Sequence, residues 1–282
     1  MLNATRSTDL AEEILAEIDS NLIQLPTLPE VALQVREAVE NENADAATIA
    51  GMVANDAALS ARLLQVANSP LYRGRVEIDS IQQAITRLGV KMVRSLVIRL
   101  EMKQIFQATS YTLDQQFRKV WYTSLQVAAI SRVLASGVPD LEKEQAMLGG
   151  LIHNIGALPI LTKMDEQYGF NADEAIVTSL IEELSPGIGA RILNSWNFST
   201  TLANIPEACV DLGHDPGPVP TYTDIVVVAR LQNLSAKGGP EADADWSEVP
   251  AFAKIGMEPE VVIVDMEGPA DEIAEVRTML GG

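Results

Sequence analysis

The amino-acid sequence predicts an all-α protein, and three observations support this fold class. Alanine and leucine are plentiful whereas aromatic residues make up only 5% of the chain, and unbranched aliphatic side chains lose little rotamer freedom in a helix. Apolar residues recur at helical spacing, as in Leu10, Ile14 and Ile18. The one long β-branched run, residues 225–229, has no convincing partner strand, so we interpret it as part of a buried helix.

Helix boundaries follow from capping and helix-breaking residues. Pro29 fits the first turn of a helix, and Asp45 and Ser199 are suited to cap helix N-termini. Gly89 can turn the chain between two helices because glycine adopts positive φ without a steric penalty, and Gly-Val-Pro at 137–139 ends a long helix. The expected helices cover residues 8–20, 29–39, 45–55, 57–67, 80–88, 90–106, 114–135, 142–161, 185–196, a short stretch from 199, and then 222–234, 247–254 and 270–280.

The sequence indicates a soluble protein. The longest aliphatic run, residues 225–229, is far shorter than the roughly 20 residues that span a bilayer. The polar N-terminal segment lacks the apolar centre of a signal peptide. The single cysteine, Cys209, cannot form an internal disulfide, which suits a reducing compartment. We therefore expect a cytoplasmic protein with no membrane partner.

The net charge of −19 is unevenly distributed. Residues 60–103 hold 8 basic and 3 acidic side chains, between acidic flanks. Nucleic acid is disfavoured as a partner, because a protein that follows a phosphate backbone needs a net positive face. The default interpretation of this basic block is a solvated helix surface. The alternative is a surface that binds a small anion or an acidic protein partner through Arg73, Arg75, Arg87, Lys91 and Arg94. The last three share a helical stripe if one helix continues across Gly89.

The chain has only two histidines, His153 and His214. His153 is followed by Asn154, where an aspartate would complete half of a metal site. A neutral amide offers a carbonyl dipole in place of a formal negative charge, which removes much of the attraction for a divalent cation. A binuclear centre would need several more imidazoles, and only His214 remains to supply one. We therefore expect no bound metal and no cofactor.

Four short sequence motifs follow one another along the chain in a specific order and at specific spacings. They read Leu25-Pro26-x-Leu28-Pro29, Asn55-Asp56-x-x-Leu59-Ser60-x-Arg62-Leu63-Leu64-x-x-Ala67-Asn68-Ser69, Ala84-Ile85-x-x-Leu88-Gly89 and Gly150-Leu151-Ile152-His153-Asn154-Ile155-Gly156. This series resembles the HDOD family, bacterial output domains related to the HD-type metal-dependent phosphohydrolases, over about residues 20–235. The motif residues expected to have structural roles are Pro26, Pro29, Asp56, Arg62, Asn68, Ser69 and Gly89.

The resemblance implies an all-helical fold in which an N-terminal helical bundle packs against a degenerate HD-like helical bundle. It also implies a place in signalling and no established catalytic activity. On this basis we expect an N-terminal helical subdomain at residues 1–108, a degenerate HD-like subdomain at 109–236, and a linker with a C-terminal helical extension at 237–282.

The resemblance also implies a vestigial metal site at His153 and Asn154. Thr123 and Ser185 stand where HD enzymes have further histidines, and Arg230 falls at the place of a late aspartate. A guanidinium beside a divalent cation would repel it. We interpret His153 as a neutral imidazole that donates one N–H to a carbonyl or to Asn154; the alternative is a surviving ligand of a weak mononuclear site.

The leading hypothesis is a non-catalytic signalling module that acts through a partner protein or a small anionic signal. A second hypothesis is an HD-type phosphohydrolase with a nonstandard, oxygen-rich metal site, for which Asp211, Asp215 and Asp224 are candidates. A third is a DNA-binding helix-turn-helix in residues 80–106. The oligomeric state, the signal and the partner stay open at this point.

Overall fold

The computed structural model describes residues 4–20, 23, 25–26, 30–40, 46–54, 57–74, 76–106, 108, 110–168, 174–237 and 245–280. Within these ranges every regular element is helical and no strand is present, which confirms the all-α prediction. The elements are α1 (Ala4–Asp19), α2 (Glu30–Glu40), α3 (Ala46–Ala54), α4 (Ala57–Ala67), α5 (Ile81–Leu88), α6 (Val90–Ile105), α7 (Tyr111–Ala135), α8 (Lys143–Ile152), α9 (Ala157–Tyr168), α10 (Glu174–Ser195), α11 (Thr200–Ala203), α12 (Ile205–Ala208), α13 (Tyr222–Lys237), η1 (Trp246–Glu248), α14 (Pro250–Ile255), η2 (Ile263–Asp265) and α15 (Pro269–Met279).

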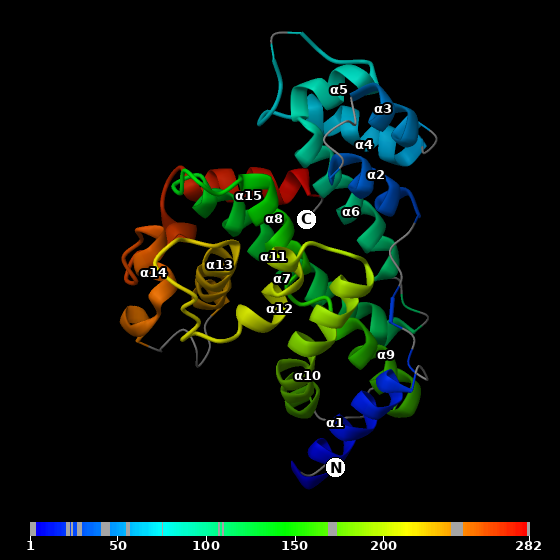
Figure 1. Ribbon diagram of the computed structural model, residues 1–282, viewed down its shortest axis with the longest axis vertical. Helices are drawn as coiled ribbons and strands as arrows, with labels where there is room; N and C mark the ends of the chain where they lie inside the picture. The colour runs from blue at the N-terminus through cyan, green and yellow to red at the C-terminus, as the bar shows by residue number, and fades with distance from the viewer. Residues whose placement is uncertain are drawn as a thin grey trace.

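Helices α2 to α6 form the first bundle, at the top of Figure 1. Ser80 caps α5 by accepting a hydrogen bond from the backbone N–H of Gln83, which satisfies one of the unpaired donors of the first turn. Gly89 ends α5 with φ of 81°, a conformation that favours glycine. The expected turn between two helices is therefore confirmed.

Helix α6 is the link between the two bundles. It packs against α2 in the first bundle and against α8 in the second. Its residues 92–99 are all buried, including the polar Ser95 and Arg99. Phe106, just past its end, packs its ring against Phe117 and Trp121 of α7, with centroid separations of 5.8 and 5.1 Å. The first bundle is thus fixed to α7 by apolar packing.

Helix α7 is the central element of the second bundle, where it contacts α8, α9, α13 and α15. Ser110 caps it and accepts a hydrogen bond of 3.1 Å from the N–H of Leu113. The sequence predicted one helix at 142–161, but the structure divides it into α8 and α9 around a turn at 153–156. It also predicted a helix start at Ser185, whereas Pro186 lies inside the longer α10.

The two ends of the described chain pack on the second bundle (Figure 1). Helix α1 lies against α10, and its Glu17 pairs with Lys163 of α9 at 2.6 Å. Helix α1 therefore packs on the second bundle, although the sequence predicts it in the N-terminal subdomain at residues 1–108. At the other end, α14 packs on α13 and α15 packs on α7. No helix in the described ranges combines the length and the apolar character needed to cross a membrane.

Candidate functional site

Two glycines position the turn between α8 and α9. Gly150 of α8 lies so close to α7 that a Cβ atom there would be 2.7 Å from Cα of Ala128. A Cβ on Gly156 would be 2.1 Å from the carbonyl oxygen of Ser185 on α10. Real Cβ contacts are longer than this, so both helix approaches require glycine. The two glycines therefore fix the positions of the helix segments on either side of His153, which lies three residues from each glycine.

His153 is nearly buried, with 7% of its surface exposed. Its Nδ1 lies 2.7 Å from the carbonyl oxygen of Gly150. Because a carbonyl can only accept, Nδ1 carries the hydrogen in this contact. This geometry fits the expected imidazole that donates one N–H to a backbone carbonyl.

Asn154 is tied to α7. The hydroxyl of Ser124 donates to Oδ1 of Asn154 over 2.6 Å. An aspartate here could accept the same hydrogen bond and would add a negative charge. The amide therefore makes a structural hydrogen bond to α7, without the charge that a cation would need.

The residues of the vestigial motif meet around one cavity of about 490 Å³. Thr123 comes from α7, His153 and Asn154 from the turn, Ser185 from α10 and Arg230 from α13. These segments are far apart in the sequence, and helix packing brings them together. The other lining residues are Val127, Ile181, Glu182, Pro186, Pro206, Val210, Asn233 and Leu234. His214 lies outside this lining, in a loop where it is partly exposed.

Two polar residues of the cavity were missed by the sequence reasoning. Glu182 lies three residues before Ser185, and Asn233 three residues after Arg230, so helical spacing alone could have placed each on the same face as its neighbour. Pro186 has no N–H, so the carbonyl of Glu182 lacks the donor that a regular helix would supply. The cavity lining therefore includes a carboxylate in addition to a cationic side.

Arg230 supplies that cationic side. Its guanidinium donates to the carbonyl oxygen of Cys209. Burial raises the pKa of the Cys209 thiol to about 11, although the charge of Arg230 acts to lower it. The thiol is therefore protonated at neutral pH and unsuited to bind a metal. Among the residues that the structure describes, no three His, Cys, Asp or Glu side chains gather in a group that could hold a metal ion.

The three acids considered for an oxygen-rich metal site have other partners. Lys254 places its ammonium 2.8 Å from Asp215 and 3.3 Å from Asp224. Burial acts to lower the pKa of Lys254, but its hydrogen bond to Asp215 and the charge of Asp224 raise it. Asp211 accepts from the N–H of Gly213 in its own loop. The lysine thus pairs with two of the three candidate acids and offsets part of the negative charge that a cation would need.

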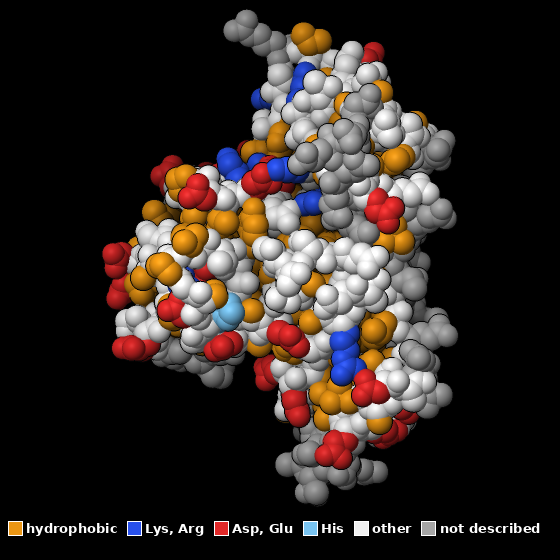
Figure 2. Space-filling model, in the orientation of Figure 1, with side chains coloured by type: hydrophobic (Ala, Val, Ile, Leu, Met, Phe, Trp, Pro, Cys, Tyr) orange, Lys and Arg blue, Asp and Glu red, His pale blue; other side chains and the backbone are white. Residues whose placement is uncertain are grey.

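The basic block does not form a single surface. Because α5 ends at Gly89, Arg87 is not on one helix with Lys91 and Arg94. Arg87 donates to the carbonyls of Ala67 and Val76, and so holds the loop after α4. Lys91 pairs with Glu142, and the nearly buried Arg94 bonds to Gln145. Arg73 is exposed, and Arg75 lies outside the described residues. Figure 2 shows basic side chains near the junction of the bundles with acidic ones among them, and other basic side chains on the upper and lower parts of the same face.

The helix-turn-helix interpretation also fails on burial. Helices α5 and α6 are present with the expected turn between them. A recognition helix must expose side chains that enter a DNA groove. Residues 92–99 of α6 are instead buried between the bundles. The pair is a packed helical hairpin of the core.

A comparison with known families identifies the chain. The model of the HDOD domain matches residues 25–208, which is more than half of the sequence. The chain belongs to the HDOD domain family.

Solved structures share the fold of this HDOD chain. A protein from Shewanella amazonensis SB2B, named provisionally as a metal-dependent phosphohydrolase, is 28% identical, with a TM-score of 0.82 and coverage of 97% of this chain and 99% of that one. An HDOD domain protein of unknown function from Geobacter sulfurreducens is 18% identical, with a TM-score of 0.71 and coverage of 97% and 98%. A protein from Marinobacter aquaeolei VT8, named provisionally as a signal transduction protein, is 19% identical, with a TM-score of 0.70 and coverage of 100% and 67%.

One curated relative is larger than this HDOD chain. An uncharacterized protein of Treponema pallidum (strain Nichols) is 25% identical over 247 residues. The match covers 83% of this chain and 45% of the relative. The chain therefore spans less than half the length of that protein.

The family-motif residues of the HDOD chain make contacts between segments. The carbonyl of Pro26 accepts from Nε1 of Trp196 at 2.8 Å. The side chain of Asn68 bonds to both the N–H and the carbonyl of Ile78, at 2.9 and 2.7 Å. Arg62 donates to the carbonyls of Thr278 and Met279 at the end of α15. Pro29 and Asp56 lie outside the described residues.

Proposed function

We propose that this HDOD chain is a non-catalytic regulatory module of signal transduction, and that its vestigial HD pocket serves binding rather than metal-dependent hydrolysis. The observation that carries the proposal is the lining of that pocket. Arg230 occupies a wall of the same cavity as His153 and Asn154. A single imidazole, an amide and a guanidinium replace the anionic and imidazole ligands that a catalytic metal requires.

The charge balance supports this proposal. Two like unit charges repel by about 4 kcal/mol at roughly 4 Å in an effective dielectric of about 20, and a divalent cation doubles the repulsion. Glu182 could offset part of this penalty, but one carboxylate and one imidazole fall short of the usual ligand set. The pocket is better suited to a small anion, because Arg230 and polar groups of Thr123 and Asn233 surround it. Such an anion, or an acidic group of a partner protein, is the signal that we propose.

The chain has only two histidines, so the imidazole region of its NMR spectrum is simple enough for a direct binding test. We expect inorganic phosphate at about 10 mM to shift the His153 signal while the His214 signal moves far less. Arg230→Gln should abolish the shift of the His153 signal. The matched control is Arg191→Gln, which changes a half-exposed arginine outside the pocket. If the His153 signal is unchanged, or moves equally in the Arg230 variant, the pocket does not bind anions as proposed.

The second candidate function is metal-dependent phosphohydrolysis. Its support is the provisional name of the Shewanella amazonensis protein, at 28% identity. We expect no hydrolysis of nucleotides or bis(p-nitrophenyl) phosphate above background with Mn²⁺, Mg²⁺ or Zn²⁺ added. Any residual turnover should be equal in the wild type and in His153→Ala, which identifies it as contamination. Turnover that depends on metal and is lost in His153→Ala would replace our proposal with this one.

A further inference from the structure

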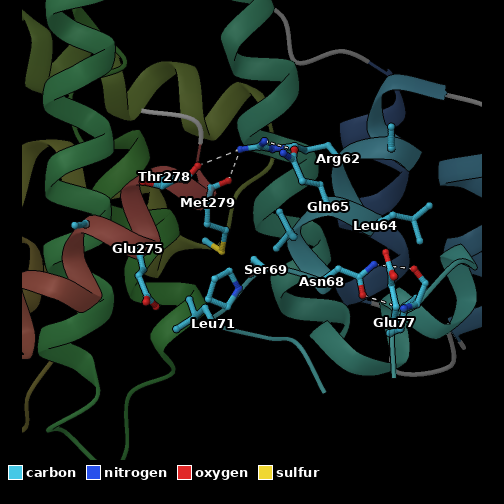
Figure 3. Close-up of a pocket in the computed structure, with 15 residues that line it drawn as sticks. Arg62, Leu64, Gln65, Asn68, Ser69, Leu71, Glu77, Glu275, Thr278 and Met279 are labelled. Carbon is cyan, nitrogen blue, oxygen red and sulfur yellow. Dashed lines mark hydrogen bonds between the residues drawn. The ribbon is translucent and has the colours of Figure 1, made fainter. Parts of the chain in front are cut away.

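A second cavity lies between α4, the loop that follows it, and α15 (Figure 3). Its volume is about 880 Å³, within the range of cavities that hold small molecules. Most of its wall is apolar and includes Leu64, Val66, Leu71, Ile78 and Met279. It shares no lining residue with the vestigial HD pocket. The cavity therefore requires an explanation of its own.

One end of this cavity is cationic. Figure 3 shows Arg62 there, beside Thr278 and Met279 and away from Glu77 and Glu275. Arg62 bonds to Gln65 and to the last carbonyls of α15, all of which are uncharged acceptors. Among the described residues, no carboxylate forms an ion pair with Arg62. Its charge is therefore offset only by dipoles.

A second arginine strengthens the positive potential at the same end. Arg99 of α6 is 2% exposed and has no ion pair within the described part of the chain. It stacks over the ring of Trp121 at 5.9 Å. Burial and then the charge of Arg62 lower the pKa of Arg99 to about 10, so Arg99 is charged at neutral pH. Two cations without a counter-charge favour an anion at the Arg62 end.

Two residues of the cavity lining also have a buried donor. Nε of Arg62 and the hydroxyl of Ser69 are buried and have no partner among the described residues. Asn68 is not available in the same way, because its side-chain amide donates to the carbonyl of Ile78 and accepts from the N–H of Ile78. Buried donors are normally paired, but these two atoms are hidden from solvent, so a molecule in the cavity would meet the rest of the Arg62 guanidinium.

The acids of the cavity limit the charge of its ligand. Glu77 and Glu275 are both exposed and line the part away from Arg62. They would repel a second negative charge on a bound molecule, which disfavours nucleotides and other polyanions. An apolar body suits the remaining wall.

We propose that this cavity binds a monocarboxylic acid with an apolar body, such as a medium-chain fatty acid, whose carboxylate contacts Arg62. The inference is independent of the function proposed for the HD pocket, because the two sites have different linings. Either one can fail while the other holds.

Isothermal titration calorimetry with octanoate and 1-octanol tests the site on the full chain. We expect octanoate to bind at least about ten-fold more tightly than octanol, because only the acid can pair with Arg62. In Arg62→Met this preference should fall to about one, since the charge is removed while the apolar wall is kept.

A cavity-filling variant locates the binding. Ala274 is exposed on α15 and lines the cavity, so Ala274→Trp should weaken octanoate binding at least about ten-fold without disturbing the core. The matched control is Ala253→Trp, at an exposed alanine of α14 outside the lining, which should leave the affinity within about two-fold. The proposal is overturned if octanoate shows no binding at about 1 mM, if octanol binds equally well, or if the two tryptophan variants behave alike.

Discussion

The guanidinium of Arg132 lies 3.0 Å from the carboxylate of Glu272, and this ion pair joins the central helix α7 to the C-terminal helix α15. Arg132 is 5% exposed. It also donates to the hydroxyl of Tyr72 at 2.8 Å and lies 3.6 Å from Glu144 of α8. One buried cation therefore fixes three helices and the loop that follows α4.

Replacement of this cation should be costly. Arg132→Met keeps much of the side-chain volume but leaves Glu144 and Glu272 without their partner. We expect the free energy of unfolding to fall by about 3 kcal/mol, the lower end for a broken buried pair, because both carboxylates are partly exposed. Urea unfolding followed by circular dichroism measures the change. The control is Arg118→Met, which breaks an exposed pair with Asp114 and should change the stability much less. Equal losses in the two variants would show that the Arg132 network does not stabilise the fold.

The glycine at the α9–α10 contact gives a second prediction. A Cβ on Gly156 would overlap the carbonyl of Ser185 and the backbone N of Gly189. Gly156→Ala should therefore push the helices apart and lower the free energy of unfolding by about 3 kcal/mol or more. Gly51→Ala, in an exposed position of α3 with nothing within 4 Å of the added atom, should instead raise stability by up to about 1 kcal/mol. Chemical denaturation of both variants gives the comparison, and a neutral Gly156→Ala would mean that the helices are less closely packed than described.

The buried thiol of Cys209 predicts a pH dependence at alkaline pH. Its pKa rises from 9.0 to about 11 on folding, chiefly through burial. The unfolded chain therefore loses this proton first, so stability is full below about pH 9 and decreases as the pH rises toward 11. Relative to Cys209→Ala, the wild type should lose about 1 kcal/mol between roughly pH 9 and pH 10. Urea midpoints at these two pH values measure the difference. Parallel pH profiles for the two proteins would contradict a buried, protonated thiol.

Local sequence signals predicted much of the fold. Gly89 and residues 137–139 correctly marked helix ends, because their effect depends on the backbone conformation of a few residues. The division of the expected helix 142–161 depends instead on the contact of Gly156 with α10, which lies about thirty residues away in the sequence. Pro186 was assigned to a helix start on local preference, but packing on both sides keeps it within α10.

The candidate site was predictable in part. The meeting of Thr123, His153 and Arg230 followed from the family resemblance, since nothing in the local sequence links three such distant positions. The alignment of Arg87 with Lys91 and Arg94 failed, because it assumed a continuous helix across a residue that ends one. The cavity beside Arg62 was not anticipated, because its walls come from α4 and α15, and the contact between Arg62 and Met279 spans 217 residues of sequence.

The central claim, that the HD pocket lacks the ligands to hold a catalytic cation, is tested most directly by metal analysis of the purified wild type and a restored variant. The variant Thr123→His, Asn154→Asp and Arg230→Asp returns three ligands to the cavity around His153. After identical purification without chelator, with Mn²⁺ and Zn²⁺ in the growth medium, we expect less than about 0.1 metal ion per wild-type chain and close to one in the variant. A tightly bound, stoichiometric ion in the wild type that is lost in His153→Ala would contradict the account.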